Sequence, residues 1–446
     1  MVAKPFPKPS PPSTPNPLET IIPTQDLLAR RARLLGRDAP LFYEEPLHIV
    51  RGAGVWLYDA AGRAYLDCYN NVAGVGHCHP EVVAALCRQA GILNVHTRYL
   101  HEMVLTYGER LISRLDPSLS MIMFMCTGSE ANDQALRIAR LHTGGEGIIC
   151  TNLTYHGNTT AVDEISPLFD RQTQPNPRVH AIPFPDTYRC RDNLAGAALT
   201  AVYLAEIDRA IAGFKASGVG LAGLLLCTVF ANEGLPNPPP DFVRQAVARV
   251  RAAGGLFIAD EVQAGFGRTG RMWGYELEGV VPDIVTMGKP MGNGHPIAAV
   301  ATRAELLDEF RAQVMYFNTF GGSPVSCAVG NAVLDVLDGE RLIDNAREVG
   351  AYVRAGLQRL QERHSLIGDI RGHGLWVGVE LVLDRHTKAP ATAAAHRVIN
   401  EMKARGVLLG RIGEFDNVIK IRPPLPFSCA NADLLLTQFD EVLRGL

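Results

Sequence analysis

Short apolar runs alternate with amphipathic segments through the middle of the chain. The run at residues 121–126 is followed by Thr127-Gly128-Ser129-Glu130 and then by apolar side chains at 131, 135 and 138, which lie on one face of a helix. Valines at 243, 247 and 250 predict a second helix, which ends near Gly254. Further buried strands are predicted at residues 147–150, 224–231, 256–259 and 284–287.

Strands that are separated by helices predict parallel pairing with right-handed crossovers. These strands are continuous apolar runs rather than alternating ones, as expected when helices cover both faces of a sheet. We therefore predict an α/β fold with a large, doubly wound and mostly parallel sheet. Ligands of such folds bind beyond the carboxyl ends of the strands, so the informative residues should follow the apolar runs.

The two ends of the chain have a different character. Residues 55–59 and 64–67 flank Ala61-Gly62-Arg63 and predict a β-hairpin, whereas the part after about residue 333 mixes helices with Gly-rich strands such as 374–381. We predict a disordered Pro-rich tail at 1–18, an N-terminal segment of a small α+β domain at 19–75, a large domain at 76–332 and the C-terminal small domain at 333–446.

The composition of the 446 residues is globular, with 47% hydrophobic and 20% charged residues. The formal charge of −3 provides no positive excess for nucleic acid or an anionic membrane, so we expect neither as a partner. The N-terminus lacks the apolar core of a secretory signal. The longest apolar run, residues 218–231, is too short to span a bilayer.

Nine scattered cysteines include no CxxC pair. Free buried thiols in a reducing compartment are the simplest account, so we expect a cytoplasmic protein. Cys78 stands between His77 and His79. Three adjacent residues of one strand point to opposite faces, and we therefore predict no metal site there.

Two ionisable residues follow neighbouring predicted strands. Asp260 ends the strand 256–259, where a buried carboxylate needs a partner such as the cationic ring nitrogen of a cofactor; a helix cap or an ion pair with Arg268 are the alternatives. Lys289 follows 284–287 in a turn where desolvation can make it a nucleophile for a Schiff base, although a surface loop lysine is the alternative. Together the two predict a pyridoxal 5′-phosphate (PLP) site, because the carboxylate keeps the pyridinium protonated.

A phosphate group needs a cradle, and the strand-to-helix turn at Gly128 and Ser129 offers one. Free backbone N–H groups and the positive end of the helix dipole bind an anion there, although Ser129 fits an N-cap without a ligand equally well. Tyr155 and His156 follow the run 147–150, and an aromatic ring there could stack on a pyridine face or simply pack in the core.

Several motifs in this order resemble the class III PLP-dependent aminotransferases, which have PLP fold type I. The resemblance runs from about residue 40 to the C-terminus, and the Pro-rich tail lies outside it. Its motifs are Thr127-Gly-Ser-Glu-Ala-Asn132, Tyr155-His-Gly157, Asp260-Glu-Val-Gln-Ala-Gly-Phe-Gly-Arg-Thr-Gly270 followed by Lys289, and Asn318-Thr-Phe-Gly-Gly322.

The resemblance implies a role for each candidate. Lys289 would bind PLP covalently and move a proton between substrate and cofactor, while Asp260 would pair with the pyridine nitrogen. The other implied cofactor contacts are Gly128 and Ser129 with the phosphate, Tyr155 of the Tyr155-His156 motif with the ring face, Gln263 with the 3′-oxygen, and Thr319 with the phosphate of the neighbouring subunit. The protein would then be a homodimer with shared active sites, or a tetramer that contains such dimers.

Other motifs are closer to one branch, the PLP-dependent phospho-lyases, which act on phosphoethanolamine or phosphohydroxylysine. These motifs are Asn70-Asn-Val72, Val75-Gly-His-Cys-His-Pro80, Thr286-Met-Gly-Lys-Pro-Met-Gly-Asn-Gly-His-Pro296 and Ile367-Gly-Asp-Ile-Arg-Gly372. The chain departs from this branch at Gly74, where the lyases usually have His, and at Arg422, where they usually have Lys.

Arg422 resembles the arginine with which many class III aminotransferases hold a substrate carboxylate through a bidentate contact. Glu233 resembles the acid that pairs with that arginine when no carboxylate is present. A structural role in a strand is the alternative for Arg422. Together with Tyr69, these residues are the candidates for substrate binding.

Arg422 favours an aminotransferase, which moves an amino group from an ω-amino acid or primary amine to an oxo acid such as pyruvate, with ping-pong kinetics. The alternative is a phospho-lyase that releases phosphate and ammonia. A catalytically silent PLP-fold scaffold is disfavoured by the intact pair Lys289 and Asp260. A Rossmann dehydrogenase is disfavoured because no GxGxxG opens the first strand–helix unit.

Overall fold

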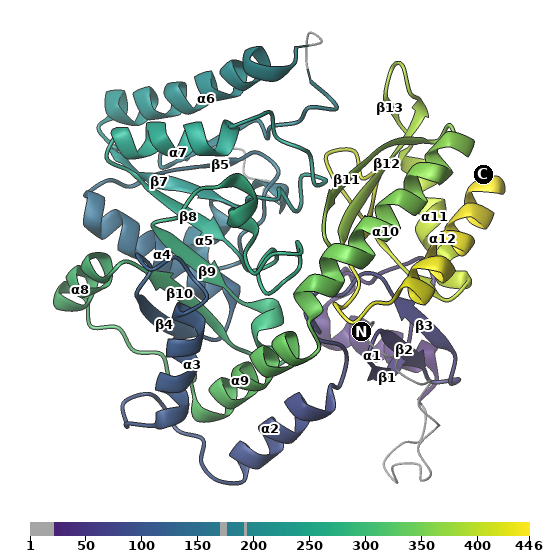
Figure 1. The fold of residues 1–446 in the computed structure, drawn as a ribbon, viewed down its shortest axis with the longest axis horizontal. Helices are drawn as coiled ribbons and strands as arrows, with labels where there is room; N and C mark the ends of the chain where they lie inside the picture. Colours follow the sequence, from purple (N-terminus) through teal and green to yellow (C-terminus); the bar gives the residue numbers. More distant parts are fainter. Residues whose placement is uncertain (1–21, 170–175, 191–193) are drawn as a thin grey trace.

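The computed structural model describes residues 22–169, 176–190 and 194–446. The Pro-rich tail predicted for residues 1–18 lies outside these ranges. Figure 1 shows two lobes: one surrounds a large sheet, and the other contains the C-terminal elements above the N-terminal strands.

The larger lobe contains a seven-stranded sheet in the described part of the chain. Its strands, in spatial order, are β4 (Met121–Met125), β10 (Ala298–Thr302), β9 (Ile284–Met287), β8 (Leu256–Asp260), β7 (Leu221–Leu226), β5 (Gly147–Thr151) and β6 (Val179–Ile182). The strands from β9 to β6 pair in parallel, whereas β10 is antiparallel to both of its neighbours. The predicted mostly parallel α/β sheet is confirmed. The reversal at β10 follows from the short connection after β9, because a parallel crossover needs about a dozen residues or more.

Helices cover both faces of this sheet. Ile148 and Ile149 are consecutive in β5 and belong to two separate clusters of buried residues. The first cluster includes Ile138 of α4 (Gly128–Thr143) and residues of α8 (Ala304–Gln313); the second includes residues of α6 (Gly196–Ser217) and α7 (Phe242–Ala252). Further helices of this lobe are α2 (Pro80–Ala90), α3 (Glu102–Ile112), α5 (Thr160–Asp163) and α9 (Pro324–Gly339), and α2 and α3 pack against α9.

The smaller lobe has an antiparallel sheet of order β11-β12-β16-β15, and β13 pairs with β12. These strands are β11 (Ile367–His373), β12 (Trp376–Asp384), β13 (Ala389–Pro390), β15 (Gly410–Ile412) and β16 (Val418–Ile421). Its helices are α10 (Leu342–Arg363), α11 (Thr392–Ala404) and α12 (Cys429–Arg444).

The N-terminal strands join this lobe through a second small sheet. Its strands are β1 (Ile49–Ala53), β2 (Trp56–Asp59), β3 (Ala64–Asp67) and β14 (Val407–Leu408), and α1 (Thr24–Leu35) precedes them. The antiparallel pair β2 and β3 confirms the predicted hairpin, and β3 pairs in parallel with β14 from the C-terminal part. The limits of the two domains stay predictions.

The strand predicted at residues 224–231 ends earlier than its apolar run. β7 stops at Leu226, and residues 227–231 form turns, with Phe230 in the left-handed region at φ 48°. These residues are buried because they lie in an interior loop rather than in a strand. An apolar run indicates burial, and a buried loop has the same signature as a buried strand.

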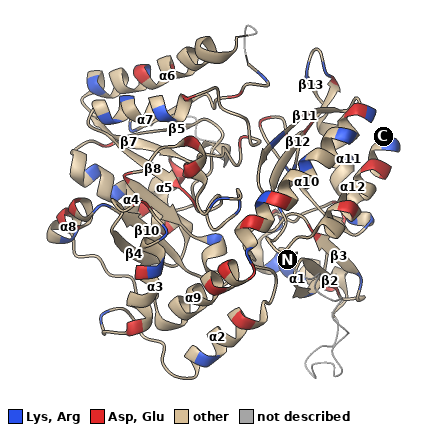
Figure 2. Ribbon diagram, viewed as in Figure 1, with Lys and Arg blue, Asp and Glu red and all other residues tan. Residues whose placement is uncertain are grey.

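Charges are mixed along the surface helices. Figure 2 shows basic and acidic residues interspersed on α6, α8 and α10. None of the helices in the described ranges combines the length and the apolar character needed to cross a bilayer.

Candidate active site

The carboxyl ends of β8 and β9 and the N-terminus of α4 meet at a cavity of about 270 Å³. The cofactor-binding candidates that line this cavity are Gly128, Ser129, Tyr155, His156, Asp260, Gln263 and Lys289. The structure therefore brings together residues that are far apart in the sequence. Among those candidates, Thr319 is not one of the lining residues, and its side chain is exposed.

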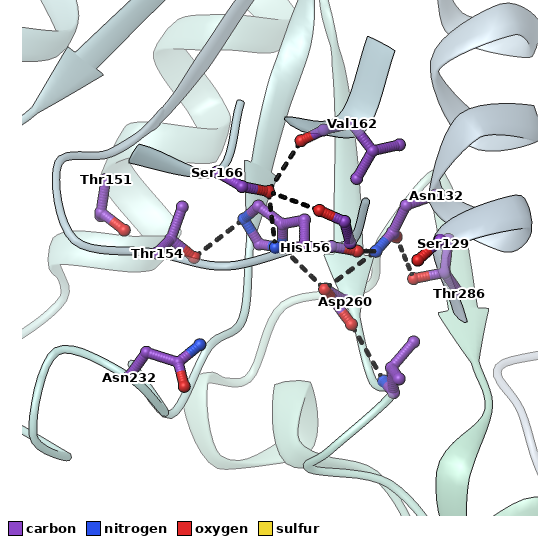
Figure 3. A network of polar contacts seen from close by, with 12 residues as sticks. Ser129, Asn132, Thr151, Thr154, His156, Val162, Ser166, Asn232, Asp260 and Thr286 are labelled. Carbon is purple, nitrogen blue, oxygen red and sulfur yellow. Dashed lines mark hydrogen bonds and ion pairs between the residues drawn. The ribbon is translucent and has the colours of Figure 1, made fainter. Parts of the chain in front are cut away.

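Asp260 is buried at the end of β8, with 5% of its surface exposed. Its Oδ2 lies 2.6 Å from His156 Nδ1 and accepts a hydrogen bond from Asn132 Nδ2 at 3.1 Å, while Oδ1 accepts one from the Val262 amide at 3.0 Å (Figure 3). Burial acts to raise the pKa of Asp260, but His156, and to a smaller extent Lys289, hold it below its usual value. The Asp260 carboxylate is therefore kept ionised although it is buried.

A chain of hydrogen bonds continues from His156 (Figure 3). Thr154 Oγ1 lies 3.0 Å from His156 Nε2, Ser166 Oγ accepts from the His156 amide at 3.0 Å, and Asn132 Nδ2 donates to the His156 carbonyl at 2.7 Å. Thr286 Oγ1, on β9, donates to Asn132 Oδ1 at 2.6 Å. The acid is thus fixed by groups from α4, β9 and the segment after β5.

Sequence reasoning missed Asn132 as a positioning residue, although a signal was present. It is a polar residue beside Ala131, Ala135 and Ile138 on the apolar face of the predicted helix, and it is fully buried. The alternative partner of Asp260 is ruled out in this structure, because the Arg268 guanidinium donates to the carbonyls of Leu375 and Pro423.

Lys289 begins a short 3₁₀ turn, η4 (Lys289–Gly292), directly after β9 and Gly288. Its φ of 32° lies in the left-handed region, where residues other than glycine are uncommon and often functional. Burial and the nearby Arg422 lower the pKa of Lys289, against the opposing effect of Asp260. A lowered pKa increases the share of neutral amine, which is the nucleophilic form.

The start of α4 can hold an anion and is also capped. Thr127 Oγ1 accepts from the Glu130 amide at 3.2 Å, and Glu130 Oε2 accepts from the Thr127 amide at 3.0 Å. The amides of Gly128 and Ser129 precede the first intrahelical bond, so the capping box and an anion cradle coexist here. A Cβ atom on Gly128 would come within 2.7 Å of Val262 Cγ1, so only glycine fits this turn without a shift.

Arg422 is buried beside the cavity, with 5% of its surface exposed. Its Nη1 donates to Gln263 Oε1, and its Nε donates to the Tyr69 carbonyl at 3.1 Å. Glu233 is also buried, but its carboxylate accepts from Thr151 Oγ1 and from the Asn232 amide at 3.0 Å. Among the described residues no ion pair joins Glu233 to Arg422, so the structure does not bring these two candidates together.

Lys420 is a cation that sequence reasoning missed. It lies two residues before Arg422 in an extended segment, so the two side chains share one face. Lys420 is 4% exposed, its Nζ is 6.0 Å from the centre of the Tyr69 ring, and Arg422 Cζ is 5.3 Å from the same centre. Burial and the nearby Arg422 and Lys289 hold the pKa of Lys420 well below its usual value.

The strands next to Lys420 leave room for this side chain. Its cross-strand partners are Gly378 on β12 and Gly410 on β15. The Tyr69 ring occupies the space beside Gly410, where a Cβ would come within 2.3 Å of Tyr69 Cε2. The visible signal in the sequence is the alternation Lys420-Ile421-Arg422, with polar residues at every second position of an apolar strand.

These residues fit PLP. A buried, ionised Asp260 suits a cationic ring nitrogen, the α4 turn at Gly128 leaves space and amides for a phosphate, and Lys289 presents an amine with a lowered pKa to the same cavity. The three groups line one cavity, as a single ligand with those three chemical features requires.

Comparison with known proteins identifies relatives along nearly the whole chain. A family model described as aminotransferase class-III matches residues 42–443. An alanine–glyoxylate aminotransferase 2-like protein of Drosophila melanogaster is 43% identical over 426 residues, covering 93% of this chain and 86% of that protein. An ethanolamine-phosphate phospho-lyase homolog of Caenorhabditis elegans is 38% identical over 437 residues, covering 94% and 93%.

A solved structure is similar over almost the same range. It is a phospholyase from Arthrobacter in complex with phosphoethanolamine, with 46% identity and a TM-score of 0.92, and the match covers 94% of this chain and all of that one. An aminotransferase of Bacillus anthracis matches with 26% identity and a TM-score of 0.85, over 95% and 99% of the two chains. Relatives with both kinds of activity in their names therefore share this fold.

Proposed function

The chain belongs to the class III aminotransferase family, and from this premise we propose that it acts on a small primary amine whose other end carries an anionic group. The cofactor of the family is PLP. When bound, PLP supplies an electron sink for the carbon that carries the amino group. The residues of this chain would bind the cofactor, orient the substrate and remove a proton from that carbon.

We assign the cofactor contacts to the residues that line the cavity. Lys289 would hold PLP through a covalent bond of its Nζ, and the same amine, once the substrate amine has displaced it from that bond, would accept the proton from the substrate carbon. Asp260, oriented by His156, would keep the ring nitrogen protonated. The remaining contacts are the amides of Gly128 and Ser129 with the phosphate, the Tyr155 ring with the face of the pyridine, and Gln263 with the 3′-oxygen.

The proposed site for the anionic end is formed by Lys420, Arg422 and Tyr69. Two buried basic side chains near one ring are costly to charge together unless an anion offsets them. Burial raises the pKa of Glu233, and both of its oxygens already accept hydrogen bonds, so it is a weak counter-ion. An incoming anionic group would compensate both cations.

The charge of this site favours a phosphate over a carboxylate. A phosphate monoester carries a charge of about −1.5 to −2 near pH 7, whereas a carboxylate carries one negative charge. We therefore propose a phospho-lyase that acts on a phosphorylated amine such as phosphoethanolamine and releases phosphate and ammonia. The pair of buried basic side chains, Lys420 with Arg422, is the observation that carries this choice, and the similarity to the Arthrobacter phospholyase supports it.

Amino-group transfer is the second candidate. It would move the amino group of an ω-amino acid or primary amine to an oxo acid such as pyruvate. The buried Arg422 guanidinium favours it, because its fork suits a carboxylate, and so does the similarity to aminotransferase 2-like proteins.

One assay separates the two reactions. The purified protein is supplied with PLP and phosphoethanolamine in the absence of any oxo acid, and inorganic phosphate is measured. Phosphate release that is lost in Lys289→Ala supports the lyase. Alanine formation from pyruvate and an amine, without phosphate release from phosphoethanolamine, would overturn it in favour of the aminotransferase.

We further propose a homodimer with shared sites, alone or within a tetramer. The segment around Thr319 is exposed and apolar, with Met315 88% and Phe320 71% exposed, and Leu100 is 98% exposed. Large exposed apolar side chains such as Met315 and Phe320 in one short segment are typical of an interface. Sedimentation of the holoenzyme, with Thr319→Ala tested for PLP affinity, checks both parts of the proposal.

A further inference from the structure

The segment between β3 and α2 forms an arch, residues 67–77, whose two ends are joined by a contact between a histidine and a carboxylate. His77 Nε2 lies 2.6 Å from Asp67 Oδ2, and Asp67 is fully buried. Asp67 Oδ1 also accepts from the amides of Tyr69 and Asn70, both at 2.9 Å, and Oδ2 accepts from Asn70 Nδ2 at 3.0 Å. The Asp67 carboxylate therefore binds both His77, at the far end of the arch, and the turn at Tyr69 and Asn70 inside it.

One side of the arch holds Arg422. The Tyr69 carbonyl accepts from Arg422 Nε at 3.1 Å, and the Cys68 carbonyl accepts from the Arg422 amide at 2.7 Å. Because the Tyr69 amide is bound by Asp67, the carboxylate places the peptide units around Tyr69. The direction of the guanidinium thus depends on a carboxylate that does not touch it.

The other side of the arch lies against the turn that follows Lys289. Asn293 Oδ1 accepts from the Val75 amide at 3.0 Å, and Asn293 Nδ2 donates to the Gly76 carbonyl at 2.9 Å. A Cβ atom on Gly74 would lie 2.9 Å from Pro290 Cβ, so the arch approaches this turn closely. Val72, between the two sides, lines the cavity.

We propose that Asp67 and His77 are positioning residues, which act through the Tyr69 carbonyl on Arg422 and so set the affinity for the anionic end of the substrate. The inference rests on the proposed function, because it needs an anionic substrate group at Arg422. His79, two residues further on, serves a different purpose, since its Nε2 lies 3.0 Å from Glu340 Oε1 and its Nδ1 accepts from the Glu81 amide at the start of α2.

The test measures the affinity of the holoenzyme for phosphoethanolamine and for n-butylamine, from the rapid change in cofactor absorbance on mixing, before turnover. His77→Ala should weaken phosphoethanolamine binding by about tenfold, the loss expected for about one hydrogen bond to a charged group, and leave n-butylamine within about twofold. His77→Gln keeps a donor for Asp67 and should restore most of the affinity. The matched control, His79→Ala, removes a histidine–carboxylate pair outside the arch and should leave the ratio of the two affinities unchanged.

A double-mutant cycle with Arg422→Ala tests the route of the effect. If His77 acts through Arg422, then His77→Ala should cost little further phosphoethanolamine affinity once Arg422 is truncated. Equal weakening of both amines, or full additivity with Arg422→Ala, would overturn the inference. Should His77→Ala not fold, Asn70→Ala removes one bond to Asp67 and should show the same selectivity on a smaller scale.

Failure of the inference about Asp67 and His77 can be distinguished from failure of the proposed phospho-lyase function. Wild-type protein that binds β-alanine but not phosphoethanolamine contradicts the phospho-lyase. The arch is then tested with β-alanine as the anionic probe, and the expected loss in His77→Ala is the same.

Discussion

Asp260 and His156 form a buried pair in which Oδ2 and Nδ1 are 2.6 Å apart, although 104 positions of sequence separate them. Both side chains are nearly inaccessible, and Asn132 binds to both residues. A carboxylate with few water contacts keeps its charge only through such partners. His156 and Asn132 thus maintain the charge that we propose for the contact of Asp260 with a pyridinium ring.

Replacing His156 by phenylalanine should raise the pKa of Asp260. The burial that raises this pKa would remain, while the hydrogen bond and charge that lower it would be lost. Because the ionised form exists above the pKa, loss of activity and cofactor affinity on acidification should begin at a higher pH than in the wild type. The pH dependence of cofactor absorbance and turnover measures this shift, and an unchanged acid limb would contradict the role of His156.

The sequence pattern could predict those residues of the site that directly follow a predicted strand or begin a predicted helix. Asp260 and Lys289 each follow an apolar run, and Gly128 stands between a strand and a helix, so local spacing places all three at one edge of a parallel sheet. The early end of β7 was not predictable in this way, because burial in a loop and burial in a strand give the same apolar pattern. The direction of β10 was not predicted either, because an apolar run does not specify the direction of its strand.

The substrate side of the site was less predictable, because it is built from contacts across long stretches of sequence. Arg422 was identified, but its partners are Gln263, 159 positions away, and the Tyr69 carbonyl, 353 positions away. Lys420 has no motif of its own, and its significance arises from the burial of a cation beside another cation. Neither the distant partners of Arg422 nor the burial of Lys420 can be read from the identity of neighbouring residues.

Binding of phosphoethanolamine should involve proton uptake at Lys420. The pKa of the free side chain is held well below its usual value by burial and nearby cations, and an anion placed beside it raises that pKa again. Between the two values, the affinity should fall as pH rises. Calorimetry in buffers of different ionisation enthalpy should show less proton uptake in Lys420→Met than in the wild type.

The control for this experiment is Lys215→Met, which removes an exposed lysine in the last turn of α6. It should leave affinity and proton uptake unchanged, while Lys420→Met weakens binding by about tenfold. Equal proton uptake in Lys420→Met and the wild type would show that another group takes the proton.

Glu261 should make the stability of the protein fall as pH rises from about 4.5 to 7. Burial raises the pKa of this carboxyl from 4.5 to about 7, although the amides of Gly274 and Tyr275 bind it. A group with a raised pKa stabilises the fold fully below its unfolded value and loses that contribution as pH rises through the folded value. Glu261→Gln cannot titrate, so its stability deficit should be larger near pH 5 than near pH 8, by on the order of 2 kcal/mol. Thermal unfolding at both pH values measures the difference, and a deficit independent of pH would contradict it.

Gly74→Ala should destabilise the turn that carries Lys289. The added Cβ would lie 2.9 Å from Pro290 Cβ, one residue after Lys289, so either the arch or the turn must move. Such overpacking costs about 1–3 kcal/mol, and a displaced Lys289 should also bind PLP more slowly. Gly213→Ala is the matched control, because its Cβ would meet nothing within 4 Å and the residue lies inside α6, where alanine is favoured over glycine by about 1 kcal/mol. Gly74→Ala should therefore lower the thermal stability of the apoenzyme and slow cofactor incorporation, whereas Gly213→Ala should raise the stability and leave the rate of incorporation unchanged. Wild-type behaviour of Gly74→Ala in both measurements would mean that the arch does not rest on the Lys289 turn.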